Sequence, residues 1–257
     1  ILRRGRPGGD KGSNNGGKAD TCKNTYAHEL GPLFLWPMTL AANNRWINAF
    51  CRLVRIVSAP YPRANGTSLV NTDIEIGKDA HGTPVLVDVE ELLATRLLVQ
   101  GNSGSGKSHL LRRLLEQSAG LVQQVIIDPE GDFVSLADHF DHVVVEGASY
   151  SPREIEALAG RIRQHRASVV LALEDLEVEQ QIRCAAQFLT ALFDAPREHW
   201  FPALVVVDEA QMFAPAAAGE MAEDTRRMTL SAMTNLMCRG RKRGLAGIVA
   251  TQRLAKL

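Results

Sequence analysis

The sequence predicts an α/β fold with a mostly parallel central sheet that helices cover on both faces. From about residue 73 onward, short and almost wholly apolar runs alternate with segments of helical periodicity. Strands buried on both faces have such continuous apolar runs, and parallel strands need crossover segments between them. A glycine-rich loop after one run and an acidic pair after another mark the carboxyl ends of strands, where α/β sheets bind ligands.

The first expected elements precede the glycine-rich loop. Residues 73–77 alternate as a strand does, residues 79–82 form a turn, and residues 84–89 form a second strand. This pattern predicts a short β-hairpin ahead of the main sheet. The apolar run from Leu97 to Gln100 leads into the loop, and leucines at helical spacing predict a helix from Lys107 to Ser118.

The rest of the chain alternates between strands and helices. Apolar runs predict strands at 125–127, 142–145, 169–173, 204–207 and 247–250. Helical spacing predicts helices at 152–165, 177–193 and 221–238. This succession is typical of a parallel sheet with helices packed against both faces.

The N-terminal segment differs in composition. Residues 1–20 are mainly Gly, Arg, Lys, Asn and Ser, and residues 21–70 show no clear periodicity. We expect a low-complexity or poorly ordered segment over residues 1–72 and an ordered domain over residues 73–257, truncated at its C-terminus. Ten Lys or Arg against three Asp or Glu up to Asn71 suit either a solvated arm or a nucleic-acid contact.

Bulk composition narrows the class of protein. The formal net charge is zero, so the whole molecule gives no electrostatic argument for nucleic acid. No apolar stretch approaches the ~20 residues that span a bilayer, and no signal peptide is evident. The four cysteines form no C-x-x-C pair, which argues against a zinc site or a disulfide framework and favours the cytoplasm.

The glycine-rich loop fits G-x-x-x-x-G-K-[ST], the pattern of a phosphate-binding loop, or P-loop. Its glycines let backbone N–H groups face phosphates, and the next helix adds its positive N-terminal end. We expect Lys107 to reach the β- and γ-phosphates and the Ser108 hydroxyl to bind Mg²⁺. The residues expected to hold the nucleoside triphosphate are Gly101, Asn102, Ser103, Gly104, Ser105, Gly106, Lys107, Ser108 and His109.

An acidic pair follows the run at 204–207. A P-loop enzyme needs a carboxylate for its Mg²⁺ at the end of a second strand, and Asp208 has this position. Glu209 is placed to act as the general base toward the attacking water. This pairing indicates a hydrolytic motor rather than a kinase or GTPase. The alternative is that the two acids merely open a helix.

A second acidic group follows the run at 125–127. Asp128, Glu130 and Asp132 surround a Pro-Gly turn. One interpretation places Asp128 or Glu130 beside the nucleotide, and the other is an ordinary polar loop. The sequence favours neither.

The last expected strand ends in Gln252 and follows a basic turn. We expect Gln252 to contact the γ-phosphate or position the water, rather than to lie at a plain surface strand end. The basic turn contains Arg239, Arg241 and Arg243. It is open to three interpretations: a solvated turn, a nucleic-acid contact, or an arginine that enters the nucleotide site of a neighbouring subunit.

In this order, these segments resemble the HerA/FtsK branch of P-loop ATPases, and HerA-like proteins in particular. The resemblance covers about residues 73–254 and is carried by residues 76–77, 82–85, 100–108, 128–133, 206–210, 240–244 and 250–253. Asp132 stands where the family often has Glu, and residues 1–70 do not resemble the small β-barrel of HerA proteins. The resemblance implies a P-loop NTPase fold of the RecA/ASCE type.

The resemblance also implies a function. It implies ATP hydrolysis with Mg²⁺, coupled to movement of double-stranded DNA through a hexameric ring of identical chains. Arg241 is then the first candidate for the arginine acting in trans, and Arg239 the second. We therefore expect a HerA-like DNA translocase or helicase ATPase, in a repair or defence setting with a nuclease or other defence partner. The alternatives are an ATPase motor of conjugative secretion type and a nucleotide-binding oligomeric scaffold with little turnover.

Overall fold

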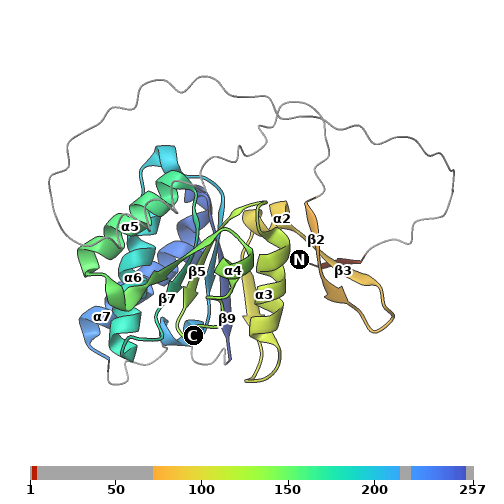
Figure 1. Cartoon of the computed structure of the whole chain (residues 1–257), viewed down its shortest axis with the longest axis horizontal. Helices are drawn as coiled ribbons and strands as arrows, with labels where there is room; N and C mark the ends of the chain where they lie inside the picture. Colours follow the sequence, from red (N-terminus) through yellow and green to blue (C-terminus); the bar gives the residue numbers. More distant parts are fainter. Residues whose placement is uncertain (1, 5–71, 215–220, 253–257) are drawn as a thin grey trace.

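A six-stranded sheet forms the centre of the molecule (Figure 1). The computed structural model describes residues 2–4, 72–214 and 221–252. The strands are β4 (Leu97–Gln100), β5 (Gln123–Asp128), β6 (His142–Glu146), β7 (Ser168–Ala172), β8 (Ala203–Val207) and β9 (Leu245–Thr251). Their order is β4-β9-β8-β5-β7-β6, and all neighbours pair in parallel. The predicted α/β class is confirmed.

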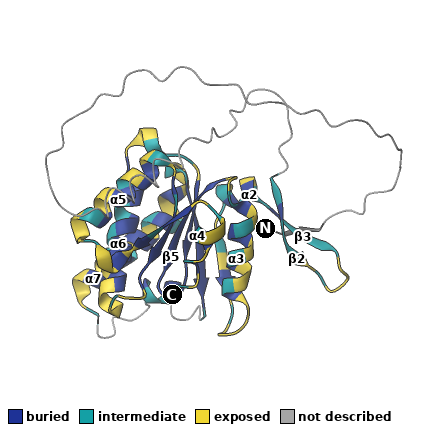
Figure 2. Ribbon diagram, viewed as in Figure 1, coloured by how far each residue is buried: buried dark blue, intermediate teal, exposed yellow. Residues whose placement is uncertain are grey.

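Helices cover both faces of this sheet. On one face lie α5 (Pro152–His165), α6 (Val178–Phe193) and α7 (Glu223–Thr234). The other face carries α2 (Val89–Ala94), α3 (Lys107–Ser118) and α4 (Leu136–His139). In Figure 2 the strands between the two layers are buried, and the outer sides of the helices are exposed.

The alternation of side chains along each strand divides the apolar core in two. On β5, Val125 and Ile127 pack with α5 and α6, whereas Ile126 packs with α3 on the opposite face. Val205 and Val206 of β8 divide between the two faces in the same way. Every second residue of a strand points to the same face, so both faces need apolar side chains. This explains why the strands have continuous apolar sequences.

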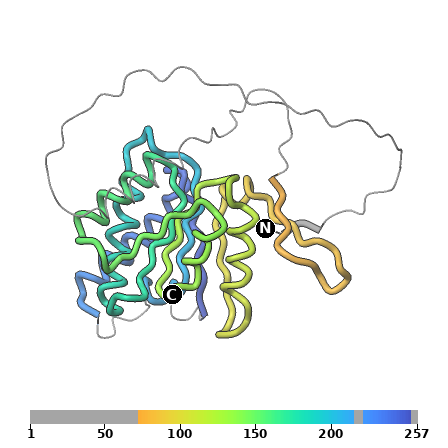
Figure 3. The backbone as a smooth tube through the Cα atoms, in the orientation of Figure 1, coloured from red at the N-terminus to blue at the C-terminus, as the bar shows by residue number. Residues whose placement is uncertain are grey.

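A small antiparallel sheet lies beside α3. Strands β2 (Asp73–Lys78) and β3 (Pro84–Asp88) form the predicted hairpin, which the backbone trace in Figure 3 shows next to α3. Leu2–Arg4 form a further strand, β1, on the other edge of β3. The free edge of β3 offers these three residues backbone partners. Residues 5–71 lie outside the described part of the chain.

Two boundaries differ from the sequence prediction. The strand expected to end at residue 89 ends at Asp88, because its carboxylate accepts hydrogen bonds from the N–H groups of Glu90 and Glu91 and so starts α2. The helix expected over 221–238 is regular only to Thr234. It continues as a π-helical turn, η4 (Asn235–Arg239), and a 3₁₀ turn, η5 (Gly240–Arg243).

Short 3₁₀ turns complete the described elements. They are η1 (Gly147–Ser149), η2 (Arg197–His199) and η3 (Ala210–Met212). Among the helices that the structure describes, none is both long and apolar enough to cross a membrane.

Candidate nucleotide-binding site

The P-loop connects β4 to α3 through glycines in left-handed conformations. Gly104 and Gly106 have φ angles of 74° and 88°, which side chains other than glycine rarely adopt. The Gly101 N–H donates to the carbonyl oxygen of Thr251 at 3.3 Å, which links the start of the loop to the end of β9. The loop therefore follows the carboxyl end of one strand and contacts the carboxyl end of its neighbour.

The N-terminus of α3 offers unshielded N–H groups. Gly106 precedes the helix and makes no side-chain cap, and the first turn contains no acidic residue. The first N–H groups of a helix lack partners within the helix and favour an anion. Lys107 is buried, Ser108 is half-buried and His109 is exposed. The geometry suits bound phosphates.

The acidic pair after β8 lies in a left-handed turn. Asp208 and Glu209 are both buried, and Glu209 has a φ of 45°. A residue other than glycine in this region costs about 1–3 kcal/mol and is typical of functional sites. The Glu209 carbonyl accepts the Met212 N–H at 2.8 Å and so starts η3, but its side chain caps nothing. Opening a short turn therefore does not account for the carboxylate of Glu209.

Amide side chains hold that carboxylate. Gln252 Nε2, at the end of β9, donates to Glu209 Oε1 at 3.0 Å. Gln211 Nε2 donates to Glu209 Oε2. The Thr251 hydroxyl in turn donates to Gln211 Oε1 at 2.7 Å. The structure thus joins Glu209 and Gln252, both selected from the sequence. It adds Gln211, which lies in no motif identified from the sequence, and Thr251, which lies in the segment 250–253 but had no expected role.

Asp128 holds the loop after β5. Its carboxylate accepts the N–H groups of Gly131, Asp132 and Phe133 at 2.9, 3.1 and 2.8 Å. Burial raises the pKa of Asp128 to about 6, although these hydrogen bonds oppose the shift. Of the two interpretations for this segment, the structural one accounts for Asp128.

Glu130 differs from Asp128, because charged groups of the candidate site affect its pKa. Partial loss of hydration raises the pKa of its carboxyl group, and the negative charges of Glu209 and Asp132 act in the same direction. Lys107 opposes them. The charges of Lys107 and Glu209 therefore both act on the Glu130 carboxylate.

Asp208 and Ser108 carry the oxygen donors that Mg²⁺ prefers. Burial raises the pKa of Asp208 to about 6, and the negative charges of Glu209, Asp128 and Asp132 add to the shift. A bound cation would offset this repulsion. In the described part of the chain, no group of three or more His, Cys, Asp or Glu side chains could hold a metal ion. Mg²⁺ bound to a nucleotide needs only one or two protein ligands, because phosphates and water supply the rest.

The basic turn lies at the amino ends of the strands, opposite to the end where the P-loop lies. It precedes β9, whereas the P-loop and Glu209 follow the carboxyl ends of their strands. The seven residues of β9 separate the amino ends of the strands from the carboxyl ends by about 20 Å. An arginine in this turn therefore cannot reach the nucleotide site of its own chain.

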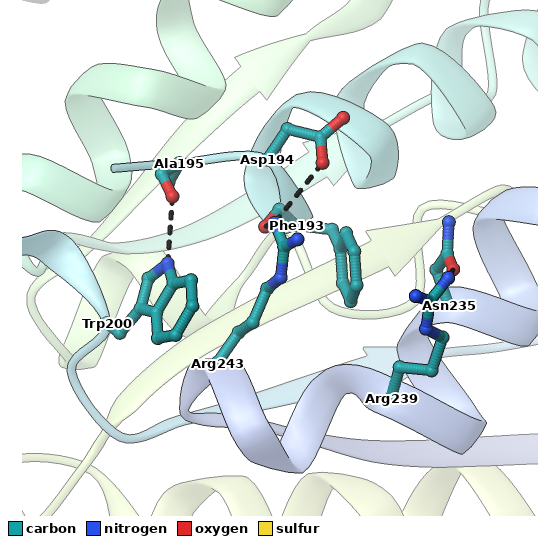
Figure 4. A network of polar contacts seen from close by, with 7 residues as sticks. All are labelled: Phe193, Asp194, Ala195, Trp200, Asn235, Arg239 and Arg243. Carbon is teal, nitrogen blue, oxygen red and sulfur yellow. Dashed lines mark hydrogen bonds and ion pairs between the residues drawn. The ribbon is translucent and has the colours of Figure 1, made fainter. Parts of the chain in front are cut away.

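Arg243 is fixed within its own chain (Figure 4). Its guanidinium lies 3.9 Å from the centre of the Phe193 ring and 5.2 Å from that of Trp200. It also donates to the Phe193 carbonyl at 2.6 Å and to Asp194 Oδ1 at 3.2 Å. These contacts attach the basic turn to the end of α6.

Arg239 and Arg241 are exposed. Arg241 Nη1 donates to the Ala94 carbonyl at 3.1 Å, and Arg239 Nη1 donates to Asn235 Oδ1, one turn earlier, at 3.1 Å. Figure 4 shows Arg239 apart from the cluster around Arg243. The turn therefore presents these two arginines on a support that Arg243 fixes.

Arg163 of α5 also holds the basic turn in place. It is fully buried, and its guanidinium donates to Gln123 Oε1 at 3.2 Å and to the carbonyls of Phe201 and Arg243 at 2.9 Å each. Burial lowers the pKa of Arg163 to about 10, so it remains charged at neutral pH. A buried cation thus holds the segments before β8 and β9 together.

Comparison with known proteins agrees with this geometry. Residues 74–191 match the family model described as "Helicase HerA, central domain". The matched part includes the P-loop and ends before the segment with Asp208 and Glu209. None of the curated protein sequences matches the chain significantly.

Two solved structures are similar to this chain, and the first of them shares its fold. VirB4 of Thermoanaerobacter pseudethanolicus is similar with a TM-score of 0.50 and 14% identity, over 74% of this chain and 79% of that one. The genome packaging NTPase B204 from Sulfolobus turreted icosahedral virus 2 has a TM-score of 0.37 and 15% identity, over 63% and 67%.

The fold, the P-loop and these matches define the class of protein: this chain carries an ATP-binding P-loop NTPase domain. Within that class, residues 74–191 are similar to the central domain of HerA helicases.

Proposed function

We propose that this domain drives a motor that uses ATP to translocate or unwind double-stranded DNA. The supporting observation is the 3.0 Å hydrogen bond between Gln252 and Glu209, at the ends of the two strands nearest to the P-loop strand. A hydrolytic motor needs an acid for the water and a polar group for the γ-phosphate at one place.

The proposed roles follow from these positions. The P-loop from Gly101 to Ser108 binds the phosphates, with Lys107 on the β- and γ-phosphates and His109 as a further contact. Mg²⁺, held by Ser108 and by Asp208 mostly through water, would offset the charge of the phosphates.

Two side chains act on the water in this proposal. Glu209 accepts its proton as general base, and Gln252 orients the water or the γ-phosphate. The two roles require that both groups stay together, as their hydrogen bond keeps them.

The arginines support an oligomer with shared sites. Arg241 is the first candidate for action in trans and Arg239 the second, because both are exposed and lie about 20 Å from their own P-loop. An arginine suits this role because it stays charged and binds phosphate with two N–H groups. We propose a homohexameric ring.

The DNA cargo is supported by the helicase description of the matching family. A nuclease or another defence protein is the partner we propose. A cytoplasmic location is supported by Cys184 and Cys238, the cysteines in the described residues, neither of which is in a disulfide.

The first experiment measures ATP hydrolysis by the chain with and without duplex DNA. We expect DNA to stimulate turnover and Lys107→Ala to abolish it, because the β- and γ-phosphates lose their cation. Glu209→Gln should keep ATP bound but reduce turnover at least a hundredfold. Filter binding of labelled ATP to each variant separates lost binding from lost chemistry.

Other outcomes identify the alternatives. A rate of ATP hydrolysis that is the same with and without duplex DNA would contradict the DNA motor and favour a motor of conjugative secretion type. Tight ATP binding without turnover would favour a nucleotide-dependent scaffold. Wild-type rates in Glu209→Gln would show that Glu209 is not the base.

A further inference from the structure

Gln211 lies between the proposed catalytic acid and the strand next to the P-loop. It belongs to η3, the turn that Glu209 starts. Its side-chain amide uses both ends: Nε2 donates to Glu209 Oε2, and Oε1 accepts from the Thr251 hydroxyl at 2.7 Å. Thr251 is buried, and its carbonyl accepts the Gly101 N–H. A chain of hydrogen bonds therefore connects the start of the P-loop with Glu209.

The chemistry of the partners fixes the orientation of this amide. A carboxylate only accepts hydrogen bonds, so the nitrogen of Gln211 must face Glu209. The oxygen then faces Thr251, whose hydroxyl can donate. A glutamate at position 211 would place a second acid against Glu209, and repulsion between the two carboxylates would disfavour this contact. An alanine would contact neither partner. Among uncharged side chains of this length, an amide serves both partners.

The two oxygens of Glu209 have different partners. Oε2 is held by Gln211 of its own turn, and Oε1 is held by Gln252 of β9. Gln252 is the residue proposed to contact the γ-phosphate or the water, so Oε1 is the oxygen on the reacting side. Oε2 then serves to anchor the carboxylate.

We propose that Gln211 is a positioning residue that, with Thr251, anchors Glu209 Oε2 so that Oε1 faces the attacking water. This inference rests on the proposed role of Glu209 as general base. A carboxylate held at one oxygen keeps the other at a fixed distance from the water, and a displacement of about 1 Å can cost on the order of a hundredfold in rate. Thr251 relays the position of the P-loop strand to this anchor.

The test compares Gln211→Ala and Gln211→Glu with wild type in single-turnover hydrolysis. Both variants should lower the rate constant roughly ten- to a hundredfold, with the Kd for ATP within about twofold, because Gln211 is not proposed to touch the nucleotide. Thr251→Val should also lower the rate constant. Thr251→Ser keeps the hydroxyl and should have the wild-type rate constant.

A double variant separates positioning from a structural role. If Gln211 acts only through Glu209, then Gln211→Ala added to Glu209→Gln changes the residual rate less than about twofold. An equal further loss, or a Kd for ATP that rises as the rate falls, would overturn the inference. So would wild-type rates in both Gln211 variants.

Failure of the proposed function gives a different result. If the wild-type chain binds ATP without turnover, the general base is wrong, and the anchor is tested by the ¹⁵N signals of the side-chain amides. The Gln211 signal should then shift in Glu209→Gln and in Thr251→Val. An unchanged signal would overturn the anchor as well.

Discussion

Asp208 illustrates how the site costs stability at the scale of one residue. The carboxylate is buried, and its pKa of about 6 lies above the ordinary value of 3.8. Between these values the folded chain binds more protons than the unfolded chain, so the contribution of Asp208 to stability falls as pH rises from about 4 to 6. Above that range the full penalty remains. A bound cation or a neutral side chain would remove it.

We therefore expect Asp208→Asn to be more stable than wild type but inactive. At pH 7.5 in EDTA, its free energy of unfolding should be about 2–3 kcal/mol larger, since the pKa is raised by about two units and each unit corresponds to ~1.4 kcal/mol. Urea denaturation at several pH values measures this. The difference should shrink toward zero at pH 4, where Asp208 is protonated.

Two results would contradict this prediction. A variant that is less stable at pH 7.5 would mean that the Asp208 carboxylate stabilises the fold. Equal differences at pH 7.5 and pH 4 would mean that its charge is not the cause. Thr190→Ala, on the opposite side of the sheet, serves as a polar control.

At the scale of the element, α5 combines a predictable helix with an unpredicted anchor. Helical spacing predicts both of its bounds. Ser151 and Glu154 form a capping box at its start, and Pro152 is its first residue. The burial of Arg163 is not local, since its partners at Phe201 and Arg243 are far along the chain.

We expect Arg163→Met to destabilise the chain by about 2–3 kcal/mol. Methionine fills similar space, but the carbonyls of Phe201 and Arg243 lose a charged donor, and unpaired buried carbonyls are costly. The urea midpoint measures the effect, and amide exchange should increase at Gly244 and Ala203. Gln164→Ala, at the exposed neighbouring position, should leave the midpoint within error. An unchanged midpoint in Arg163→Met would contradict the anchor.

Short elements show the limit of local prediction. Helical periodicity does not reveal α2, because this helix has only six residues. Its cap at Asp88 and the acids Glu90 and Glu91 are nevertheless present in the sequence. Strand β1 forms because β3 has a free edge, and no pattern in residues 2–4 reveals such a partner.

At the scale of the whole molecule, the proposal requires that neighbouring chains complete each other. We expect Arg241→Ala and Lys107→Ala each to lose turnover alone. Mixed together, they should regain part of it, because some sites then combine an intact P-loop with an intact arginine. Steady-state hydrolysis over a series of mixing ratios measures this. The same series with Arg239→Ala identifies which arginine acts.

The outcome can also go against this arrangement. No recovery at any ratio, with intact oligomers by light scattering, would contradict action in trans. Wild-type turnover of both arginine variants, with weakened binding of duplex DNA, would assign the basic turn to the cargo instead.

The sequence predicts the parts of the site that depend on local motifs. The P-loop, Asp208 and Glu209 follow strands and form recognisable patterns, and the parallel sheet brings their strand ends to one edge. Gln211 and the role of Thr251 could not be predicted, because they depend on a contact between segments 40 residues apart. The distance between the basic turn and the P-loop of the same chain could not be predicted either, because it depends on the direction in which β9 runs in the sheet.

The position of β9 also affects how the protein is made. Among the strands of the six-stranded sheet it comes last along the sequence, yet it lies between β4 and β8. Until residues 245–251 emerge, β4 has no strand partner in the six-stranded sheet. The nascent chain therefore exposes the edges of β4 and β8, which are prone to pairing with other chains. Protection during synthesis is needed until β9 fills the place between β4 and β8.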